Sequence, residues 1–260
     1  MFDALYVAAS GMRGQQLQVD TIAHNLANLN TVGFRRGVAS FSEVSAALAA
    51  AATSDLSQPM SLATVMRGAG VSTDVALSSV AGELKQTGEA LDVAIDGLGF
   101  IEVIRADGTP AYTRAGKLRI NDEGLLAAGD GSPLAARIEI PSDTRRVNIL
   151  PDGRVSVVVG DSDDPVEIGQ IELVAFANPS VLSAAGANLY VAPAAAGEPQ
   201  VAAPGELGLG SLRQGFVESS NVQLADELVT MMLAQRAFEL NSRVVQAADQ
   251  MLSITNSLYR

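Results

Sequence analysis

Apolar residues recur at alternating steps of three and four positions near the N-terminus of the chain. This line contains seven apolar residues and one Gln: Leu5, Ala8, Met12, Gln15, Val19, Ile22, Leu26 and Leu29. Such spacing places the side chains on one face of an α-helix and predicts a coiled-coil-type helix. Gly11 and Gly14 lie in the same segment. Each weakens a helix by about 1 kcal/mol relative to Ala, but each also permits close approach of a neighbouring element.

The C-terminal end carries the same spacing more strongly. All eight positions of its alternating line are apolar: Leu233, Ala237, Leu240, Val244, Ala247, Met251, Ile254 and Leu258. A second apolar line at steps of seven runs beside it: Leu224, Met231, Phe238, Val245, Leu252 and Tyr259. Together the lines form a stripe wider than a two-stranded coiled coil needs, so this helix is expected to contact more than one neighbour. Ser220 and Gln223 fit a capping box, which predicts a helix from Ser220 to Tyr259.

Two interpretations of these apolar ends are open at this point. In the first, the two helices pair within one chain and pack on the rest of it. In the second, the broad stripe serves packing between different chains. The intervening sequence favours the second interpretation, because it does not look like a partner for long helices.

Between about residue 90 and residue 195 the apolar period shortens to two. Short runs of this kind end at turns that contain Gly, Asp or Asn: 92–96, 100–104, 117–120, 125–126, 147–149, 155–159 and 168–176. Short strands at this spacing are typical of an antiparallel β domain, whereas the strand–helix alternation of a Rossmann or flavodoxin-like fold is missing. The pattern therefore predicts an α+β fold, with long N- and C-terminal coiled-coil-type helices flanking an antiparallel β domain.

Two stretches rich in small residues flank the expected β domain. Val44 to Ser61 is rich in Ala, Ser and Thr, and Ala192 to Gly210 contains three prolines. Such composition is typical of linkers. We therefore expect three regions: a terminal helical domain (1–34 with 217–260), extended intermediate segments (35–90 with 196–216) and a β-rich domain (91–195).

Composition and charge narrow the possible functions. The 260 residues include no Cys, no Trp and a single His, and the net charge is −12. The lack of Cys excludes disulfides, thiol catalysis and Cys-ligated metals. The acidic balance disfavours nucleic acid and anionic membrane surfaces as partners. The start carries Asp3 and no basic segment, and the longest uncharged stretch is interrupted by Asn and Pro, so neither a cleaved signal peptide nor a transmembrane segment is expected.

Motifs for catalysis, cofactors or metals are weak. Four Gly-x-Gly pairs lack the third Gly of a dinucleotide-binding loop, and the acidic run 161–164 lacks the Gly and Glu of a calcium loop. Carboxylates at 89, 92 and 96 have the residue types of a glycoside hydrolase pair, but no aromatic-rich sugar platform accompanies them. His24 lies on the expected N-terminal helix, where a lone His is usually a surface or packing residue. We expect no catalytic, cofactor or metal site.

Segments at both ends and in the middle resemble one known family. Ile22 to Arg35, which reads IAHNLANLNTVGFR, resembles the N-terminal signature of flagellar axial proteins, the rod and hook group. Gly215 to Val222 and the following helix are similar to the closing segment of that group, and Leu91 to Phe100 matches its middle. Length and the segments 112–116 and 188–190 fit the distal rod members best, with a hook or proximal rod subunit as the alternative. His24 departs from the Asn usual in the family, and 44–52 is richer in Ala.

The resemblance implies a structural protein without enzymatic activity. Its subunits would stack helically into a hollow shaft that transmits torque, with the terminal helices lining an inner tube and the β domain facing outward. The implied partners are further copies of the chain, proximal rod and hook proteins, and the surrounding basal-body rings. Export through the flagellar type III apparatus, without a cleaved signal, would bring the protein to the periplasm-spanning rod. The rival from another class is a β-domain carbohydrate hydrolase with a helical oligomerisation stalk.

The apolar lines and the family-like motifs together predict an assembly interface. Its expected residues are Leu5, Met12, Val19, Ile22, Asn25, Leu26, Asn28, Gly33, Phe34, Asn221, Leu233, Phe238, Leu240, Val244, Met251 and Ile254. Gly33 follows the end of the N-terminal line and is expected to adopt a positive φ in a helix stop. Phe34 would then anchor the chain where it turns away from the helix.

Overall fold

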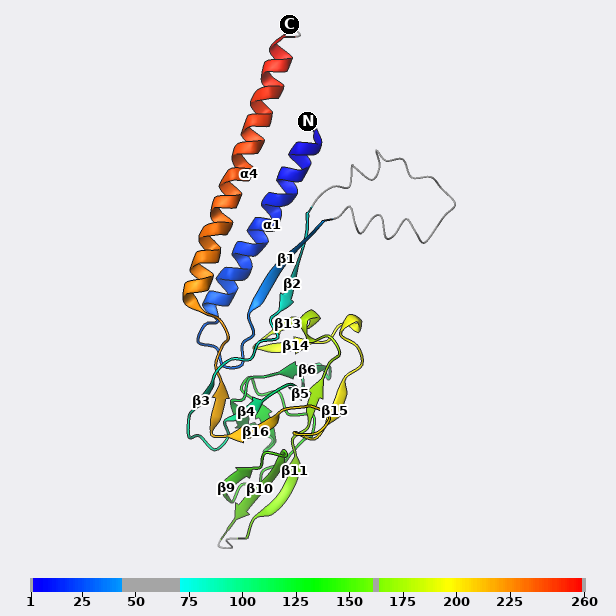
Figure 1. Ribbon diagram of the computed structural model, residues 1–260. Coiled ribbons are helices and arrows are strands. Elements are labelled where there is room, and N and C mark those ends of the chain that lie inside the picture. Colours follow the sequence, from blue (N-terminus) through cyan, green and yellow to red (C-terminus); the bar gives the residue numbers. More distant parts are fainter. Residues whose placement is uncertain (1, 44–70, 161–163, 259–260) are drawn as a thin grey trace, which may run out of the picture. The chain divides into compact units, whose positions relative to one another are not determined.

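The computed structural model describes residues 2–43, 71–160 and 164–258 (Figure 1). The chain divides into two compact units. The helical unit comprises Met1–Ala27, Gly37–Ala76 and Gln223–Arg260, and the β unit comprises Asn28–Arg36 and Leu77–Val222. Terminal helices and antiparallel sheets are both present, so the predicted α+β class is confirmed.

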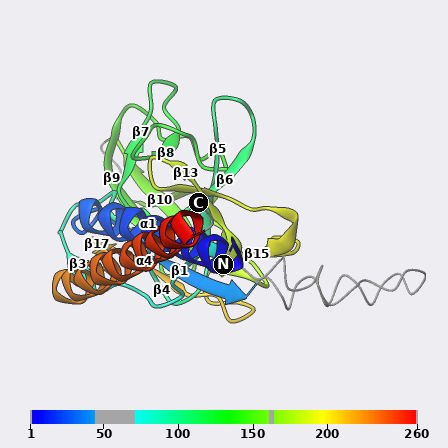
Figure 2. The same ribbon diagram turned by 90° about the horizontal axis from the view of Figure 1, so that it is seen from above.

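The helical unit contains α1 (Phe2–Ala27) and α4 (Leu224–Leu258), which lie side by side in both views (Figures 1 and 2). Strands β1 (Gly37–Glu43) and β2 (Val71–Leu77) form a two-stranded sheet, and β1 packs against α1. The glycines of α1 allow these approaches. A Cβ on Gly11 would lie 3.2 Å from the amide nitrogen of Asn241 in α4, and one on Gly14 would lie 2.8 Å from the Phe41 ring in β1.

The ends of both helices differ from the predicted positions. α1 ends at Ala27 instead of Leu29, and α4 begins at Leu224 instead of Ser220. The Ser220 hydroxyl accepts a hydrogen bond from the Val222 N–H at 3.3 Å, so it closes a local turn and caps no helix.

The β unit is built from small antiparallel sheets. The largest has the order β13-β14-β6-β5-β12-β15, and its strands are Ser183–Gly186, Leu189–Val191, Pro110–Thr113, Phe100–Ile104, Leu173–Ala175 and Gln200–Ala202. A three-stranded sheet has the order β11-β10-β9, with strands Val166–Gln170, Arg154–Val159 and Thr144–Ile149. Three pairs complete the unit: β4 (Val93–Asp96) with β16 (Ser211–Gln214), β3 (Leu84–Gln86) with β17 (Phe216–Glu218), and β7 (Leu118–Ile120) with β8 (Leu126–Ala128).

Two apolar clusters fill the β unit. The larger is aliphatic and includes Ile101, Leu126 and Val155. The smaller cluster concentrates aromatic side chains that the sequence analysis did not group: Phe100, Tyr112, Phe176 and Tyr190. Their rings meet edge to face, with the Tyr112 and Phe176 centroids 4.7 Å apart, an arrangement that the ring quadrupoles favour.

Most predicted strands are confirmed, but 168–176 is not a single strand. The Ile171 N–H donates to the Gly153 carbonyl at 2.8 Å, which continues the pairing of β11 with β10, and from Leu173 the chain pairs with β5 and β15 instead. The alternation of apolar residues over 168–176 indicates which side chains are buried. It does not show that the first part of the run pairs with one strand and the second part with another.

The segments expected to be extended also contain regular structure. Ala192 to Gly210 holds a short 3₁₀ helix (Ala194–Ala196) and β15, which pairs with β12 at the sheet edge. Pro-rich flanks are compatible with an edge strand, so composition alone did not reveal it. Strands β1, β2 and β3 lie within 35–90. The Ala-rich segment Val44–Ser61 lies outside the described residues.

Glu102 of β5 provides a test of the β unit by pH. Burial and then the nearby charge of Glu172 raise the pKa of Glu102 above its usual value. The folded chain therefore takes up this proton at a higher pH than the unfolded chain, so the cost of the buried charge is relieved as the pH falls through the folded pKa and below the usual value. We expect Glu102→Gln to be more stable than the wild type at pH 7 and to have lost that advantage at about pH 4, below the usual carboxyl pKa. Urea unfolding at both pH values checks this, and an advantage that does not change with pH would contradict it.

Candidate assembly site

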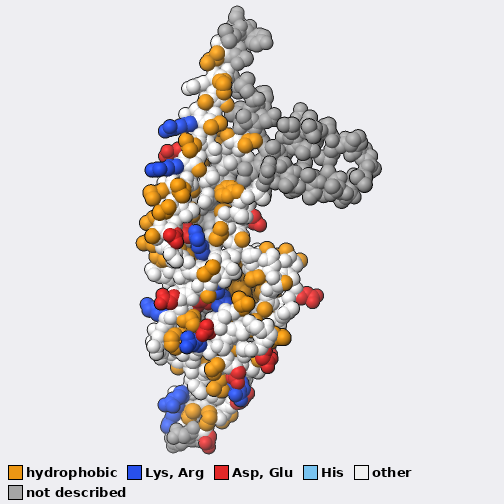
Figure 3. Space-filling view, in the orientation of Figure 1, with side chains coloured by type: hydrophobic (Ala, Val, Ile, Leu, Met, Phe, Trp, Pro, Cys, Tyr) orange, Lys and Arg blue, Asp and Glu red, His pale blue; other side chains and the backbone are white. Residues whose placement is uncertain are grey.

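A long apolar face of α4 is uncovered within the chain. Leu233, Leu240 and Val244 are 61%, 62% and 51% exposed. The same face continues through Met251 and Ile254, and Phe238 of the second apolar line is also exposed. Figure 3 shows hydrophobic side chains gathered along α4, with charged side chains between them. A continuous apolar face of this kind marks a binding surface.

The side of α4 that packs on α1 carries small and polar residues instead. Glu227, Ala234, Asn241 and Ala248 follow one another at steps of seven; Glu227 contacts Asn25, and Asn241 lies beside Gly11. Among the described side chains of α4, the buried ones are Glu227, Ala234 and Ala248. Positions 233, 240 and 247 of the predicted apolar line each come directly before a residue of this contact line. Consecutive residues of an α-helix differ by about 100° around its axis, so these side chains point in a different direction from the contact residues. These positions of the predicted apolar line therefore do not form the contact with α1, whereas Ala237 of the same line is half-buried beside it.

The apolar line of α1 behaves differently. Ile22 is buried, and Met12, Val19 and Leu26 are half-buried, where α1 packs on α4 and β1. The side chain of Leu5 is outside the described set. The apolar lines of the two terminal helices look alike in sequence but differ in exposure. The line of α1 is largely covered within the chain, and the line of α4 is largely exposed.

Asn25 joins α1 to the following strand. Its side-chain amide donates to the Gly37 carbonyl at 2.8 Å, and its Oδ1 accepts from the Gly37 N–H at 2.9 Å. The amide also lies 3.5 Å from Oε2 of buried Glu227. Asn25 is only 1% exposed, so it fixes β1 and α4 against α1 within the helical unit.

The turn after α1 has the predicted left-handed glycine. Gly33 has φ +70°, and its N–H donates to the Glu218 carbonyl at 2.7 Å. The Thr31 hydroxyl donates to Oδ1 of half-buried Asn28 at 3.1 Å, and Phe34 is buried as expected. The positive φ of Gly33 is therefore confirmed, and the burial of Phe34 is what an anchor at this turn requires.

Gly33→Ala tests this turn, and Gly88→Ala is its matched control. Both glycines have positive φ, but a Cβ on Gly33 would lie 2.5 Å from the Arg114 carbonyl, whereas a Cβ on Gly88 meets nothing within 4 Å. The left-handed conformation costs a non-Gly residue roughly 1–2 kcal/mol. We expect Gly88→Ala to lose about that much unfolding free energy and Gly33→Ala to lose clearly more, as measured by urea denaturation. Equal losses would show that the close approach to Arg114 does not matter.

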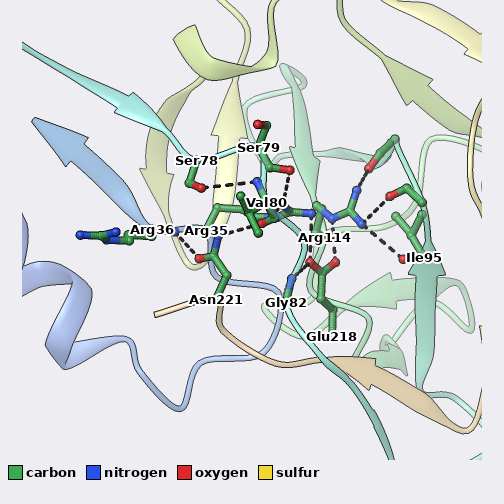
Figure 4. A network of polar contacts seen from close by, with 12 residues as sticks. Arg35, Arg36, Ser78, Ser79, Val80, Gly82, Ile95, Arg114, Glu218 and Asn221 are labelled. Atoms are coloured by element: carbon green, nitrogen blue, oxygen red, sulfur yellow. Dashed lines mark hydrogen bonds and ion pairs between the residues drawn. The ribbon is translucent and has the colours of Figure 1, made fainter. Parts of the chain in front are cut away.

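A buried ion cluster lies beside this turn (Figure 4). Glu218 is 1% exposed and bridges two arginines: its Oε1 is 2.9 Å from Arg35 and its Oε2 is 2.8 Å from Nε of Arg114. Oε1 also accepts from the Gly82 N–H at 2.8 Å. A buried carboxylate is tolerated when charges and donors surround it in this way.

The arginines also bind backbone carbonyls of separate segments. Arg35 donates to the carbonyls of Ser79, at 3.0 Å, and Val80. Arg114 donates to the carbonyls of Gly97, at 2.9 Å, Ile95, at 3.3 Å, and Gly99. Burial, followed by repulsion from Arg114, lowers the pKa of Arg35. The cluster therefore ties together loops that are distant in sequence.

Asn221 completes the attachment of the chain segments next to the helices. Its Oδ1 accepts from the Arg36 N–H at 2.7 Å, and its amide donates to the Val80 carbonyl at 2.8 Å. Asn188 similarly donates to the Val32 carbonyl at 2.6 Å, and the Arg35 N–H donates to the Tyr190 hydroxyl at 3.4 Å. The segment that follows α1 and the one that precedes α4 are thus held by the same part of the β unit.

Gly33, Phe34 and Asn221 are predicted from the sequence as part of this region, whereas Arg35, Arg114 and Glu218 are not. The signal lay in the segments that carry the family resemblance, since 22–35, 112–116, 188–190 and 215–222 all supply residues to this region. The local feature that indicates a buried ion pair is Arg35, a charged residue that directly follows Gly33 and Phe34 in the first of these segments.

The weaker candidates for chemistry do not come together. Asp92 is buried, whereas Glu89 and Asp96 are exposed, and Asp96 lies 3.6 Å from Arg213. His24 is exposed near the end of α1. Across residues 2–43, 71–160 and 164–258, no group of three or more His, Cys, Asp or Glu is arranged to hold a metal ion. In the same residues, no helix has the length and hydropathy needed to span a membrane.

Three family models match the chain in order. Residues 5–35 match the flagella basal body rod protein model, 94–157 the flagellar hook protein FlgE/F/G D1 domain, and 213–258 the flagellar basal body rod FlgEFG protein C-terminal model. Terminal helices that pack together, a β unit inserted between them and these matches define an axial protein of the flagellar rod and hook class.

Full-length relatives identify the family within that class. The chain is 40% identical to flagellar basal-body rod protein FlgG of Borreliella burgdorferi over 100% of both chains. It is 40% identical to FlgG of Caulobacter vibrioides over 98% of both, and 36% identical to FlgG of Bacillus subtilis over 100% of both. The chain belongs to the family of flagellar basal-body rod protein FlgG, the distal rod protein, and it is structural rather than an enzyme.

Proposed function

We propose that this distal rod subunit polymerises helically into a rigid hollow shaft that carries torque from the motor to the hook. The observation that carries the proposal is the apolar face of α4, a helix of 35 residues on which Leu233, Leu240, Val244, Met251 and Ile254 are all more than half exposed. A repeated contact between two different surfaces of a subunit generates an open helical polymer. Burial of a long apolar face in every subunit would give such a polymer its rigidity.

The predicted interface divides into two roles in this proposal. Exposed residues of α4 make the main contacts between subunits: Leu233, Phe238, Leu240, Val244, Met251 and Ile254. The half-buried α1 residues Met12, Val19 and Leu26 contribute the surface that they leave exposed, and Leu5 is assigned to the same interface from the sequence pattern alone. Buried or half-buried residues hold the subunit in the conformation that assembles: Ile22, Asn25, Asn28, Gly33, Phe34 and Asn221. In this arrangement the helical unit lines the inner tube and the β unit forms the outer layer.

The remaining partners follow from the place of a distal rod in the flagellum. Proximal rod and hook proteins would meet the two ends of the polymer, and the basal-body rings would surround its outer layer. The subunit would reach this place through the flagellar type III export apparatus. The family membership supports these assignments.

Electron microscopy of the purified full-length protein over a concentration series tests the polymer directly. We expect rigid tubes above a critical concentration, because each added subunit buries the α4 face. Discrete globular oligomers at every concentration would overturn the proposal. The Leu240→Asp variant is the matched control, since it should form no tubes under the same conditions.

A further inference from the structure

A cavity of about 260 Å³ opens beside the buried ion cluster of the β unit. Its walls are mostly apolar and include Leu77, Phe100, Phe176 and Pro179, and both Arg35 and Arg114 line it. The volume is several times the roughly 30 Å³ that one water molecule occupies in the liquid. The cavity is therefore large enough for a side chain from another molecule.

The charge inside this cavity is unbalanced. Two arginines share one carboxylate, Glu218, which leaves one positive charge in excess. Arg35 is only 6% exposed, and no described residue accepts a hydrogen bond from its Nε. A buried donor without an acceptor is costly, and more so when it is charged. The matching ligand has an apolar body and a carboxylate.

A projecting turn of the β unit carries both properties. Leu207 is 81% exposed and has φ +49°, and its neighbour Glu206 is also exposed. The turn is well fixed, because the Gly205 N–H donates to the Gly210 carbonyl at 3.0 Å and the Leu209 N–H to the Glu206 carbonyl at 2.8 Å. The left-handed backbone conformation is unfavourable for a leucine, and its apolar side chain gains nothing from burial while it stays in water. Such strain points to a role for the tip outside its own chain.

We propose that the Glu206–Leu207 tip of one subunit inserts into the Arg35 cavity of the next subunit. Leu207 fills the apolar part of the cavity, and the Glu206 carboxylate supplies the missing acceptor and the missing negative charge. The contact joins two different surfaces, so its repetition extends an open chain of subunits. This inference rests on the proposed helical polymer and adds a specific contact to it.

Cross-linking tests the contact directly, because the chain contains no cysteine of its own. The pair Leu207→Cys and Ser180→Cys places one thiol on the tip and one in the cavity wall. Treatment of the assembled protein with a short bis-maleimide should give a ladder of covalent dimers, trimers and longer chains. The pair Val166→Cys and Ser180→Cys is the control, since Val166 is also exposed, at 55%, but lies on β11 away from the tip in sequence.

The cross-linking outcomes separate the alternatives. A ladder from the first pair alone supports the contact. Products that stop at dimers would indicate a reciprocal twofold contact, and an internally linked monomer would show that the tip fills its own cavity; either result overturns the proposal. Wild-type tubes without cross-links from the first pair overturn only this inference. A wild type that forms no tubes overturns the proposed function and this inference with it.

The strain at Leu207 provides a second test that does not depend on cross-linking. Asn accepts the left-handed conformation more readily than Leu, so Leu207→Asn should leave the thermal stability of the dilute chain unchanged or higher. We expect the same variant to raise the critical concentration for tubes at least tenfold, and Glu206→Gln to raise it less. Val166→Thr, which also removes exposed apolar surface, should change neither quantity. Unchanged assembly of Leu207→Asn would contradict the inference.

Discussion

We expect Leu240→Asp and Val244→Asp each to abolish assembly while the isolated chain stays folded. Both side chains are more than half exposed in the single chain, so a carboxylate there remains hydrated before assembly. Burial of an unpaired carboxylate between subunits costs several kcal/mol, and the penalty recurs at every added subunit. The critical concentration should therefore rise by more than about 100-fold, as each 1.4 kcal/mol corresponds to a factor of ten.

The control for this experiment is Gln246→Asp on the polar side of α4. Gln246 is exposed and lies off the apolar face, so its variant should assemble at a concentration within a fewfold of the wild type. Circular dichroism and thermal unfolding of dilute protein establish that all three variants are folded. Tubes from Leu240→Asp at the wild-type concentration would contradict the assignment of the α4 face, and so would unfolding of its dilute chain.

Glu218→Gln is expected to cause the largest loss of stability in the β unit. Glu218 is 1% exposed and is the shared anion of Arg35 and Arg114. The amide removes the negative charge and leaves two buried arginines facing each other without it. Removal of one partner from a buried ion pair costs about 3–5 kcal/mol. Denaturant unfolding with an unchanged m-value should show a loss of this size.

Asp152→Asn is the matched control, because it also neutralises an acidic partner of an arginine. Asp152 lies 2.7 Å from Arg154, but both side chains are nearly half exposed. A pair in contact with water contributes about 0–1 kcal/mol, so this variant should lose little. A small loss for Glu218→Gln, comparable to that of Asp152→Asn, would show that the cluster does not stabilise the β unit.

The two apolar ends show what the sequence pattern can and cannot establish. The spacing correctly predicts α1 and α4, because apolar periodicity follows directly from helix geometry. It does not predict which face of α4 meets α1. That contact uses Glu227, Ala234 and Asn241, which are small or polar and carry no apolar signal. Small residues let two helices approach closely, whereas the large apolar residues remain available for other partners.

The ion cluster illustrates a second limit. Gly33 and Phe34 are recognisable locally, since a helix stop needs a left-handed residue and an anchor. Arg35, Arg114 and Glu218 are separated by about 80–100 positions, and nothing in the spacing of charges along a sequence shows that they meet. They meet because β17 pairs with β3 beside Glu218, the turn at Gly33 brings Arg35 next to it, and Arg114 follows β6 of the largest sheet. The family resemblance marked the segments involved but not their contacts.

The most direct test of the assembled α4 face is the chemical accessibility of its residues before and after polymerisation. The chain lacks cysteine, so Leu240→Cys and Val244→Cys each introduce a single thiol, and buried Ala234→Cys provides the slow reference. In dilute protein the first two thiols should react with a maleimide probe at least tenfold faster than the reference. In sedimented tubes they should become as slow as the reference. Equally fast labelling of Leu240→Cys in tubes and in dilute protein would contradict the proposal that this face joins the subunits.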